Sequence, residues 1–326
     1  MKRVFSFHSE RWETAAPFRI TGRSFEAFDC VVAELAQDGS VGRGEALGVY
    51  YTDDQLPAVM SQLDSVRAAI QNGLGREALL DALPPGGARH ALDAAMWDLE
   101  AKLSGKSVWS MVGVSDEPVE TVYTIGIEED PEAMGEKAAK ASQSLLKIKL
   151  DSDRPVARIE AIRKCRPDAR LTVDANQGWS FEQLKEIAAA MQKLGVLFIE
   201  QPLPRGSDER LESYRSPLPL CADESCLHLG ELEQASRRYQ MINIKLDKCG
   251  GLTEALTLAK AARANNLGLM VGCMGGTSMS MAPAHVLAQR CDFVDIDGPL
   301  LLKNDRPGGF DYRSAAIAVS PDLCWG

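Results

Sequence analysis

The sequence predicts an α/β protein, in which a barrel of parallel strands and crossover helices accompanies a separate N-terminal α+β domain. Short apolar runs recur about every 25 residues from Val122 onward. Segments with helical apolar spacing lie between these runs, and residues 1–115 do not follow the repeat. A strand, a helix and two loops take about this length, so each repeat is expected to be one βα unit.

The N-terminal domain is expected over residues 1–115, completed by the tail at 308–326. Residues 29–35 alternate as a strand does, a turn-rich region follows at 39–51, and 88–103 have helical spacing after a Pro-Pro-Gly-Gly break. This pattern indicates a small α+β domain that caps the rest of the molecule.

The barrel is expected over residues 116–307. Its eight strand-like runs begin at Val122, Leu145, Leu171, Val196, Leu218, Ile242, Leu267 and Phe293. Between them, segments such as 156–162 and 184–194 place apolar residues three to four positions apart, as amphipathic helices do. Eight consecutive βα units close most naturally into a TIM-like (β/α) barrel.

Ionisable residues stand near the C-terminal ends of these runs, although strands of a parallel barrel should be almost wholly apolar. They are Lys147, Lys149, Asp174, Glu200, Asp223, Lys245, Asp295 and Asp297. Equivalent strand positions meet at one end of a barrel, so these side chains should converge on the mouth where barrel enzymes keep their chemistry. For any single residue the plainer alternative is a helix N-cap for Asp and a solvated rim for Lys.

Three of the carboxylates, those of Asp174, Glu200 and Asp223, fall on consecutive strands. They would repel one another and be desolvated at a cost unless a cation lay among them. Oxygen ligands, completed by water and substrate oxygens, favour Mg²⁺, and Mn²⁺ could substitute.

The lysines indicate proton transfer. Lys147 and Lys149 are two positions apart and share a face of their strand, while Lys245 lies on the sixth strand, roughly opposite the second. Two lysines on opposite sides of a carbon can remove a proton from one face and return it to the other, as in racemisation or epimerisation. A nearby cation and restricted solvent are expected to lower their pKa values.

Five motifs on successive strands match one known family in order and spacing. They are Lys147-Ile-Lys149, Asp174-Ala-Asn176, Glu200-Gln-Pro202, Ala222-Asp223-Glu-Ser225 and Asn243-Ile-Lys245-Leu-Asp-Lys-Cys-Gly-Gly. Over nearly its whole length the chain resembles the muconate-lactonising-type subgroup of the enolase superfamily. The resemblance implies an enolase-type modified barrel with a capping domain and magnesium-assisted removal of a proton α to a carboxylate.

The resemblance also implies a role for each matched residue. The metal would be bound by Asp174, Glu200 and Asp223, the acid and base groups would be Lys149 and Lys245, and Lys147 would hold the substrate carboxylate.

The eighth strand narrows the reaction. Its Asp295-Ile-Asp297-Gly-Pro resembles the Asp-x-Asp signature of the dipeptide epimerases, whose paired carboxylates receive the α-ammonium group of a dipeptide. Two acidic side chains on one strand face suit a cationic amine. The alternative is that Asp295 caps a loop and Asp297 begins a turn. Further substrate contacts implied by the resemblance are Thr124, Met274 and Arg23.

The expected reaction is epimerisation of the C-terminal residue of an L-Ala-L/D-Xaa dipeptide. Glutamate-specific relatives carry an arginine in the capping loop, where this chain offers Arg19 and Arg23. An ungapped match instead places Phe25 near that position, which favours an apolar Xaa. Ala-Glu is the leading substrate because it is the commonest activity that the resemblance implies.

Two other classes of function stay open. A muconate-type cycloisomerase or o-succinylbenzoate synthase would use the same metal and lysines, but Asp295 and Asp297 would be unfavourable beside an anionic substrate. Sugar-acid dehydratases of the superfamily need a histidine among the late strands, whereas His285 falls in a helical segment. A metal- or peptide-binding barrel without catalysis would exchange no substrate hydrogen.

Composition restricts the partners. The chain has 36 basic and 46 acidic residues, and its net charge of −10 repels nucleic acid and anionic lipid. Its apolar runs are too short to span a membrane, and the start does not resemble a signal peptide, so a cytoplasmic location is expected.

The eight scattered cysteines are expected to be buried free thiols. A homo-oligomer and a role in peptidoglycan peptide metabolism are further expectations from the family.

Overall fold

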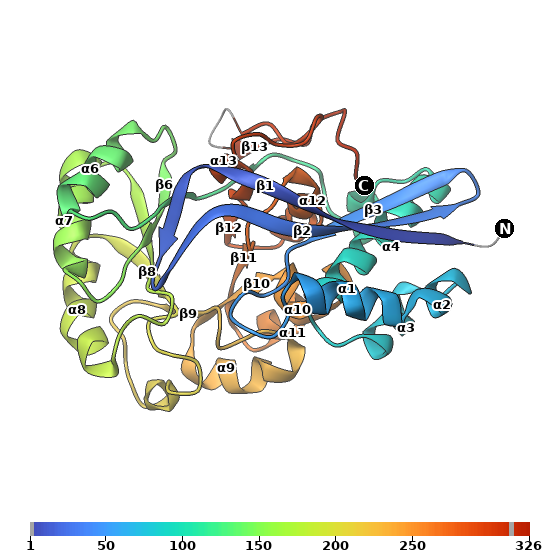
Figure 1. Cartoon of the computed structure of the whole chain (residues 1–326). Coiled ribbons are helices and arrows are strands. Elements are labelled where there is room, and N and C mark those ends of the chain that lie inside the picture. Colours follow the sequence, from blue (N-terminus) through green and yellow to red (C-terminus); the bar gives the residue numbers. More distant parts are fainter. Residues whose placement is uncertain (1–2, 313–315) are drawn as a thin grey trace.

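Two sheets organise the computed structural model, which describes residues 3–312 and 316–326. A three-stranded antiparallel sheet has the order β1-β2-β3, and an eight-stranded parallel sheet runs in sequence from β5 to β12 (Figure 1). The parallel sheet is nearly closed, because Val122 N donates to Val294 O over 2.9 Å where its first and last strands meet. The predicted fold class, a (β/α) barrel with an N-terminal α+β part, is confirmed.

The N-terminal part packs helices against its sheet. Its elements are β1 (Val4–Ile20), β2 (Arg23–Gln37), β3 (Ser40–Ala46), α1 (Leu56–Ser65), α2 (Arg67–Gln71), α3 (Arg76–Ala82), α4 (Gly87–Ser104) and α5 (Val108–Val112). Val31 and Leu35 of β2 meet Leu63, Leu92 and Leu99 of the helices in one buried cluster. Burial of these side chains provides the main stabilisation of this part.

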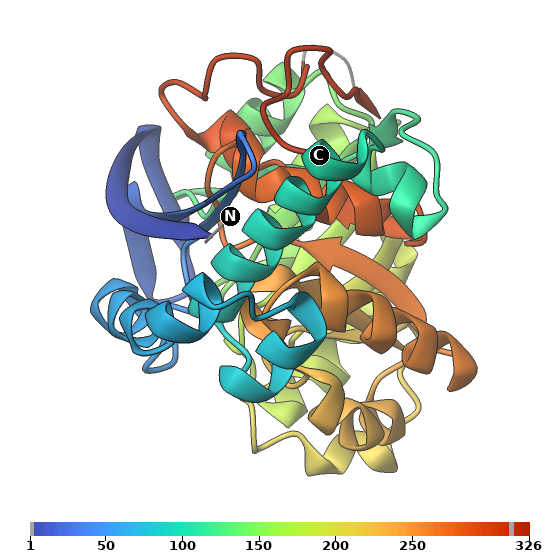
Figure 2. The ribbon, with the colours of Figure 1, turned by 90° about the vertical axis from the view of Figure 1, so that its right-hand side faces the viewer.

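Strand β3 corrects one prediction, because residues 40–46 belong to the region expected to be rich in turns. Its glycines serve close packing instead. A Cβ at Gly42 would lie 2.2 Å from Ala95 O, and one at Gly44 would lie 2.2 Å from Ala91 O. Both oxygens belong to α4, which lies beside the N-terminal strands in Figure 2. Glycine in a strand therefore marks a close helix approach here.

The barrel alternates strands and connections. Its strands are β5 (Tyr123–Ile125), β6 (Leu145–Lys149), β7 (Arg170–Asp174), β8 (Val196–Glu200), β9 (Leu220–Ala222), β10 (Met241–Lys245), β11 (Gly268–Gly272) and β12 (Phe293–Asp295). Its helices are α6 (Pro131–Lys140), α7 (Pro155–Cys165), α8 (Phe181–Lys193), α9 (Leu232–Arg238), α10 (Leu246–Cys249), α11 (Leu252–Ala264), α12 (Ser278–Ala288) and α13 (Gly298–Leu301). The eight predicted strands are thus all present.

One crossover lacks the α-helix that the repeat predicts. Between β8 and β9 the structure places the short 3₁₀ helix η1 (Glu209–Glu212). Prolines at 202, 204, 217 and 219 flank it. Proline is disfavoured inside a helix, so these residues confine any helix of this crossover to residues 205–216. A second 3₁₀ helix, η2 (Leu229–Glu231), precedes α9.

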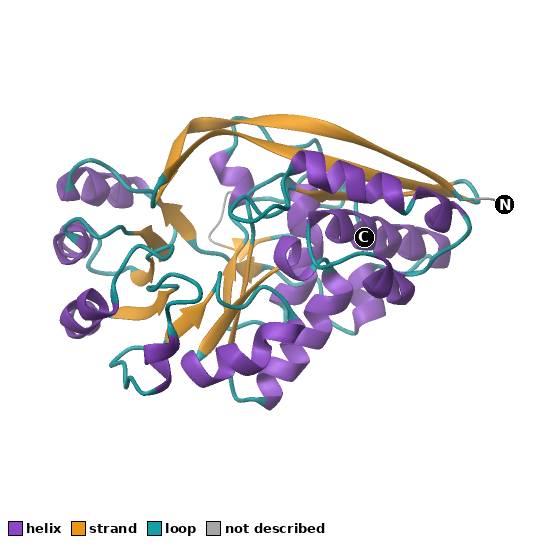
Figure 3. Cartoon of the chain, turned by 60° about the horizontal axis from the view of Figure 1, so that its bottom comes forward, coloured by secondary structure: helices purple, strands orange, loops and turns teal. Residues whose placement is uncertain are grey.

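The hairpin of β1 and β2 arches from the N-terminal part to the barrel mouth (Figures 1 and 3). At its tip, Thr21 Oγ1 lies 3.2 Å from Leu150 O and 3.1 Å from Ala175 O. Ile127 N donates to Arg19 O over 3.1 Å. The capping hairpin therefore contacts the C-terminal ends of several barrel strands.

The described tail also returns to the N-terminal part. Gly326 N donates to Asp98 Oδ1 of α4 over 2.9 Å. Before that, strand β13 (Ala316–Ile317) pairs with β4 (Val119–Glu120), which directly precedes the barrel. The division of the chain at residue 115 stays a prediction. Among the described residues, no helix is both long and apolar enough to span a membrane.

Candidate active site

Strand register sets charged residues at one level of the barrel mouth. Lys149 pairs with Asp174, which pairs in turn with Glu200 on the next strand. On the other side of the barrel, Lys245 stands level with Gly272, and Gly272 with Asp295. Equivalent positions of successive βα units thus meet at the C-terminal end of the barrel, as the repeat predicts.

Three carboxylates form a compact cluster at this mouth. One oxygen each from Asp174, Glu200 and Asp223 lies within 4.8 Å of the others, and all three side chains are buried. Glu200 Oε2 has no hydrogen bond of good geometry from the described residues, and the charged group beside it is the Lys147 ammonium, 2.8 Å away. An all-oxygen, carboxylate-rich set of this kind fits a hard divalent cation.

Lys147 and Lys149 reach the same carboxylate, which agrees with their predicted common strand face. Their ammonium nitrogens lie 3.1 and 2.6 Å from Asp174 Oδ2. Lys147, which is 1 % exposed, also lies 2.8 Å from Glu200 Oε2 and 2.6 Å from Asp295 Oδ2. This single ammonium group therefore connects the carboxylate cluster with the eighth strand.

Lys245 contacts the carboxylate cluster from the opposite side of the barrel. Its Nζ lies 2.8 Å from Asp223 Oδ2. The other oxygen, Asp223 Oδ1, accepts from Lys248 over 2.7 Å. Lys248 also donates to the carbonyl oxygens of Asp223, Asn243 and Cys226 at 2.6 to 3.1 Å. The carboxylate of Asp223 is thus fixed by two lysines.

Burial and charge act on the pKa values of these groups in opposite directions. Burial alone would raise the pKa of Asp174, but Lys149 and Lys147 lower it to about 2. Burial and the Asp174 carboxylate raise the pKa of Glu200 to about 7. Burial disfavours the charged form of Lys245, but Asp223 holds its pKa well above the usual range. The carboxylates thus outweigh burial at Lys245, and the lowering expected beside a bound cation stays a prediction.

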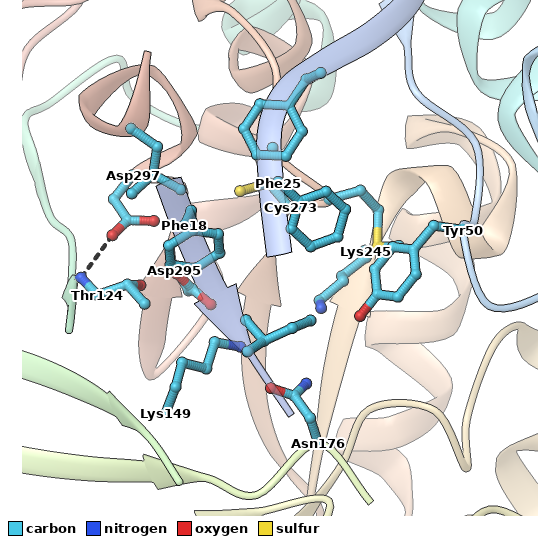
Figure 4. A pocket seen from close by; sticks show the side chains of 15 residues that line it. Phe18, Phe25, Tyr50, Thr124, Lys149, Asn176, Lys245, Cys273, Asp295 and Asp297 are labelled. Atoms are coloured by element: carbon cyan, nitrogen blue, oxygen red, sulfur yellow. Dashed lines mark hydrogen bonds between the residues drawn. The ribbon is translucent and has the colours of Figure 1, made fainter. Parts of the chain in front are cut away.

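A cavity of about 60 Å³ opens beside the cluster. Lys149 and Lys245 line it, and Figure 4 shows their ammonium ends directed into the same space from opposite sides. Thr124 and Met274 line it as well. The capping segments contribute aromatic and apolar walls: Phe18, Ile20, Phe25, Phe28 and Tyr50. The cavity thus has charged groups on the barrel side and apolar groups on the capping side.

Asp295 and Asp297 both line this cavity, but they do not share a strand face. Asp295 ends β12, whereas Asp297 lies at the N-cap position of α13, with its Oδ2 accepting from Thr124 N over 2.7 Å (Figure 4). The chain thus turns into α13 at Asp297, as the alternative for this residue expected, and the amine-binding role of the pair stays a prediction. Burial and Asp295 raise the pKa of Asp297 to about 7.

The two candidate arginines occupy different positions. Phe18 and Ile20 line the cavity, so Arg19 between them points to the other face of β1. Arg23 lies at the exposed start of β2, outside the described lining. Its guanidinium lies 4.6 Å from the ring centre of Tyr50, which does line the cavity. Arg23 therefore stands at the rim.

The structure adds residues that sequence reasoning did not single out. One of them is Lys248, which is buried. It lies inside one of the five motifs, but a lysine is usually exposed, so its sequence offered no reason to expect it at the site. Asn243 donates to Glu200 Oε1 over 2.8 Å, and its place in the same motif was the available signal. The role of Tyr50 in the cavity wall depends on tertiary packing, and its local sequence carries no such signal.

Residues weighed for other functions lie elsewhere. His285 is buried in α12, where Trp109 Nε1 donates to its Nδ1 over 3.0 Å, and burial lowers its pKa to about 4. It is therefore a packing residue. The eight cysteines are free thiols as predicted, but only four of them are fully buried: Cys30, Cys221, Cys226 and Cys249. Cys165 is exposed, and the other three are partly buried.

Comparison with known families decides the affiliation. Two family models match the chain. Residues 132–317 match the family "Enolase C-terminal domain-like", and residues 2–113 match the family "Mandelate racemase / muconate lactonizing enzyme, N-terminal domain". The chain belongs to the enolase superfamily. This superfamily membership confirms the resemblance inferred from the five strand motifs.

Relatives within the enolase superfamily have related activities. The chain is 42 % identical to the L-Ala-D/L-Glu epimerase of Escherichia coli over 97 % of its own length and 99 % of that protein. It is 44 % identical to an N-acetyl-D-glutamate racemase of Pseudoalteromonas over 76 % of this chain and 79 % of that protein. These names confirm the predicted enzyme class, an isomerase of the racemase and epimerase type.

Solved structures agree with this assignment to the enolase superfamily. One is an enolase family member from Agrobacterium tumefaciens with homology to dipeptide epimerases, solved with sodium and L-Ala-L-Glu. Its TM-score is 0.96 and its sequence identity 38 %, over 99 % of this chain and all of that chain. A dipeptide epimerase of Enterococcus faecalis, complexed with Mg and L-Leu-L-Tyr, has a TM-score of 0.91 and 26 % identity, covering 98 % of each chain.

Proposed function

We propose that this enzyme is a magnesium-dependent dipeptide epimerase that inverts the α-carbon of the C-terminal residue of L-Ala-L/D-Xaa. The observation that supports this most directly is the pair Lys149 and Lys245, directed into one cavity from opposite strands beside a carboxylate cluster. Two bases on opposite sides of one carbon are what inversion by a 1,1-proton transfer requires.

The metal would be held by Asp174, Glu200 and Asp223. A bound Mg²⁺ would supply positive charge at the substrate carboxylate, where negative charge develops as the α-proton leaves. Lys147 lies between this cluster and Asp295, so its ammonium group adds to that stabilisation and helps hold the carboxylate.

The two lysines would divide the proton transfer. One takes the α-proton from its side of the dipeptide, and the other donates a proton to the opposite face. The buried walls around both ammonium groups limit the access of bulk water, which favours transfer between the lysines and the substrate.

The α-ammonium group of the dipeptide would face Asp295 and Asp297 at the far end of the cavity. Carboxylates form charge-assisted hydrogen bonds with an ammonium group, and these fix the direction in which the dipeptide binds. Thr124 and Met274 complete this part of the wall.

Chiral chromatography with a dipeptide panel tests this function. The enzyme with Mg²⁺ is expected to convert L-Ala-L-Glu into a mixture with L-Ala-D-Glu, and to do so faster than for Ala-Leu or Ala-Phe. Faster turnover of Ala-Phe or Ala-Leu would show that the aromatic wall containing Phe25 selects an apolar side chain. Absence of inversion across the panel would contradict the proposal.

Arg23 provides a direct test of glutamate selection. We expect Arg23→Met to lower kcat/KM for Ala-Glu relative to Ala-Leu by about two- to fivefold, because an exposed ion pair contributes little. Arg19→Met, which removes another exposed arginine of the same hairpin, should leave the ratio unchanged, because Arg19 does not line the cavity. Equal effects of the two substitutions would remove Arg23 from substrate recognition.

Racemisation of an N-acylated glutamate is a second candidate, because the Pseudoalteromonas relative is named for it. Such a substrate has no α-ammonium group. If the enzyme acts on dipeptides, Asp297→Asn should lower kcat/KM for Ala-Glu by about 10- to 100-fold, as loss of a charge-assisted contact does. Any activity on N-acetyl-glutamate should change little. A parent enzyme that prefers N-acetyl-glutamate would favour the second candidate.

A cytoplasmic location, a homo-oligomer and a role in peptidoglycan peptide metabolism, which the sequence suggested, stay predictions.

A further inference from the structure

A short segment of the N-terminal part, residues 47–54, forms a capping loop between β3 and α1 that reaches the active-site cavity. Its Tyr50 lines the 60 Å³ cavity and also a second cavity of about 360 Å³. Phe25, Phe28 and Met274 are shared by the two cavities as well. The position of the Tyr50 ring therefore sets how much room a dipeptide has beside the lysines.

The capping loop is folded tightly on itself. Val49 N donates to Asp54 O over 2.9 Å, and a Cβ on Gly48 would lie 2.2 Å from that same oxygen. Gly48 also has a φ of +78°, in the left-handed region that favours glycine. At the far end, Asp54 Oδ2 accepts from Gly87 N at the start of α4 over 2.7 Å. These contacts tie the loop to itself and to the start of α4.

The other end of the loop is bound by the barrel through one carboxylate. Asp247 Oδ1 accepts from the backbone amides of Leu47 and Gly48 over 2.8 and 2.9 Å. Asp247 is 2 % exposed, and its second oxygen lies 3.4 Å from Nδ1 of His90 on α4. Hydrogen bonds from two amides to one buried carboxylate are charge-assisted and hold the loop in a defined position.

Asp247 lies on α10, the one-turn helix that directly follows Lys245 and also carries Lys248. Lys245 lines the cavity, Asp247 accepts hydrogen bonds from the capping loop, and Lys248 donates to the Asp223 carboxylate. The end of β10 and the first turn of α10 thus carry the base and contact both the loop and the carboxylate cluster. A shift of the loop relative to this helix would change the cavity wall while leaving the lysine in place.

We propose that Asp247 is a positioning residue whose carboxylate seats the capping loop on the barrel, so that Tyr50 closes the cavity around the dipeptide. The predicted effect on substrate binding rests on the proposed function, whereas the predicted effect on amide exchange in the loop does not. Asp247 touches neither the reacting carbon nor the lysine nitrogens, so it acts through binding more than through the chemical step.

Hydrogen–deuterium exchange followed by mass spectrometry tests, without any substrate, whether Asp247 holds the capping loop in place. In Asp247→Ala, peptides covering residues 47–54 should exchange at least about tenfold faster than in the parent, because two amides lose their acceptor. Asp247→Asn keeps an acceptor oxygen and should retain most of the protection. Unchanged exchange of the loop in Asp247→Ala would overturn the proposal.

Kinetics provide the second readout. Asp247→Ala should raise KM for the preferred dipeptide at least about tenfold while kcat changes less than about threefold. Asp93→Ala is the matched control, because Asp93 is also a buried carboxylate that joins α4 to the barrel, through Thr253, away from the loop. An equal rise in KM in Asp93→Ala would show that general destabilisation is the cause. If the parent lacks epimerase activity, the proposed function fails, and the exchange experiment still decides the role of Asp247.

Discussion

Replacing Lys245 with alanine is expected to abolish epimerisation, lowering kcat by at least about 10³-fold, because one of the two groups that move the α-proton is lost. Lys149→Ala should have an effect of similar size. Each variant keeps a base on one side of the substrate carbon. Each should therefore still exchange the α-hydrogen of one epimer with solvent, and the two variants should act on opposite epimers. The measurement combines chiral chromatography with proton NMR in deuterium oxide.

Controls separate this loss from a structural defect. Lys185→Ala removes an exposed lysine on α8 that pairs with Glu182, and its turnover should equal that of the parent. Metal binding by Lys245→Ala should be largely intact, which titration with Mn²⁺ followed by electron paramagnetic resonance can establish. Full turnover in Lys245→Ala would refute the assignment of this lysine.

Removal of the divalent metal is expected to lower kcat by about 10³-fold or more, because a bound cation supplies several kcal/mol of charge stabilisation and each tenfold step corresponds to about 1.36 kcal/mol. The carboxylates of Asp174, Glu200 and Asp223 provide the ligands in this account. Dialysis against a chelator followed by a polarimetric assay measures the loss. Addition of Mg²⁺ should restore the rate, and Mn²⁺ should restore at least part of it.

The metal-free protein is expected to stay folded. Lys147, Lys149 and Lys245 each lie within 2.8 Å of a carboxylate oxygen at the mouth, so ammonium groups offset the buried negative charge. Far-ultraviolet circular dichroism should therefore be unchanged by the chelator. Parent-level turnover by protein shown to be metal-free by elemental analysis would contradict the proposed cofactor.

The barrel was predictable because its signal is local and repeated. Each βα unit places its own charge at the end of its own strand, so Lys149, Asp174 and Glu200 could be assigned to one level from spacing alone. Register in a parallel barrel then brings them together without further information. The candidate metal and proton-transfer residues required nothing beyond that rule and the family resemblance.

Features that depend on contacts between distant segments were harder to predict. The glycines of β3 resemble turn residues until α4 is seen packed against them. Asp297 looks like a strand residue, but a following Gly-Pro turns the chain, and its carboxylate accepts from Thr124, more than 170 positions away. Asp247 meets Leu47 and Gly48 across about 200 positions. Local patterns carry no information on such pairings.

Solvent deuterium incorporation tests the central claim most directly. Proton NMR of L-Ala-L-Glu with the enzyme and Mg²⁺ in deuterium oxide should show loss of the α-proton signal of the C-terminal residue, together with appearance of the second epimer. The α-proton of the alanine residue should be retained, because it lies outside the reach of the lysine pair. Full retention of the C-terminal α-proton, for this dipeptide and for a panel with apolar residues, would contradict proton transfer by Lys149 and Lys245.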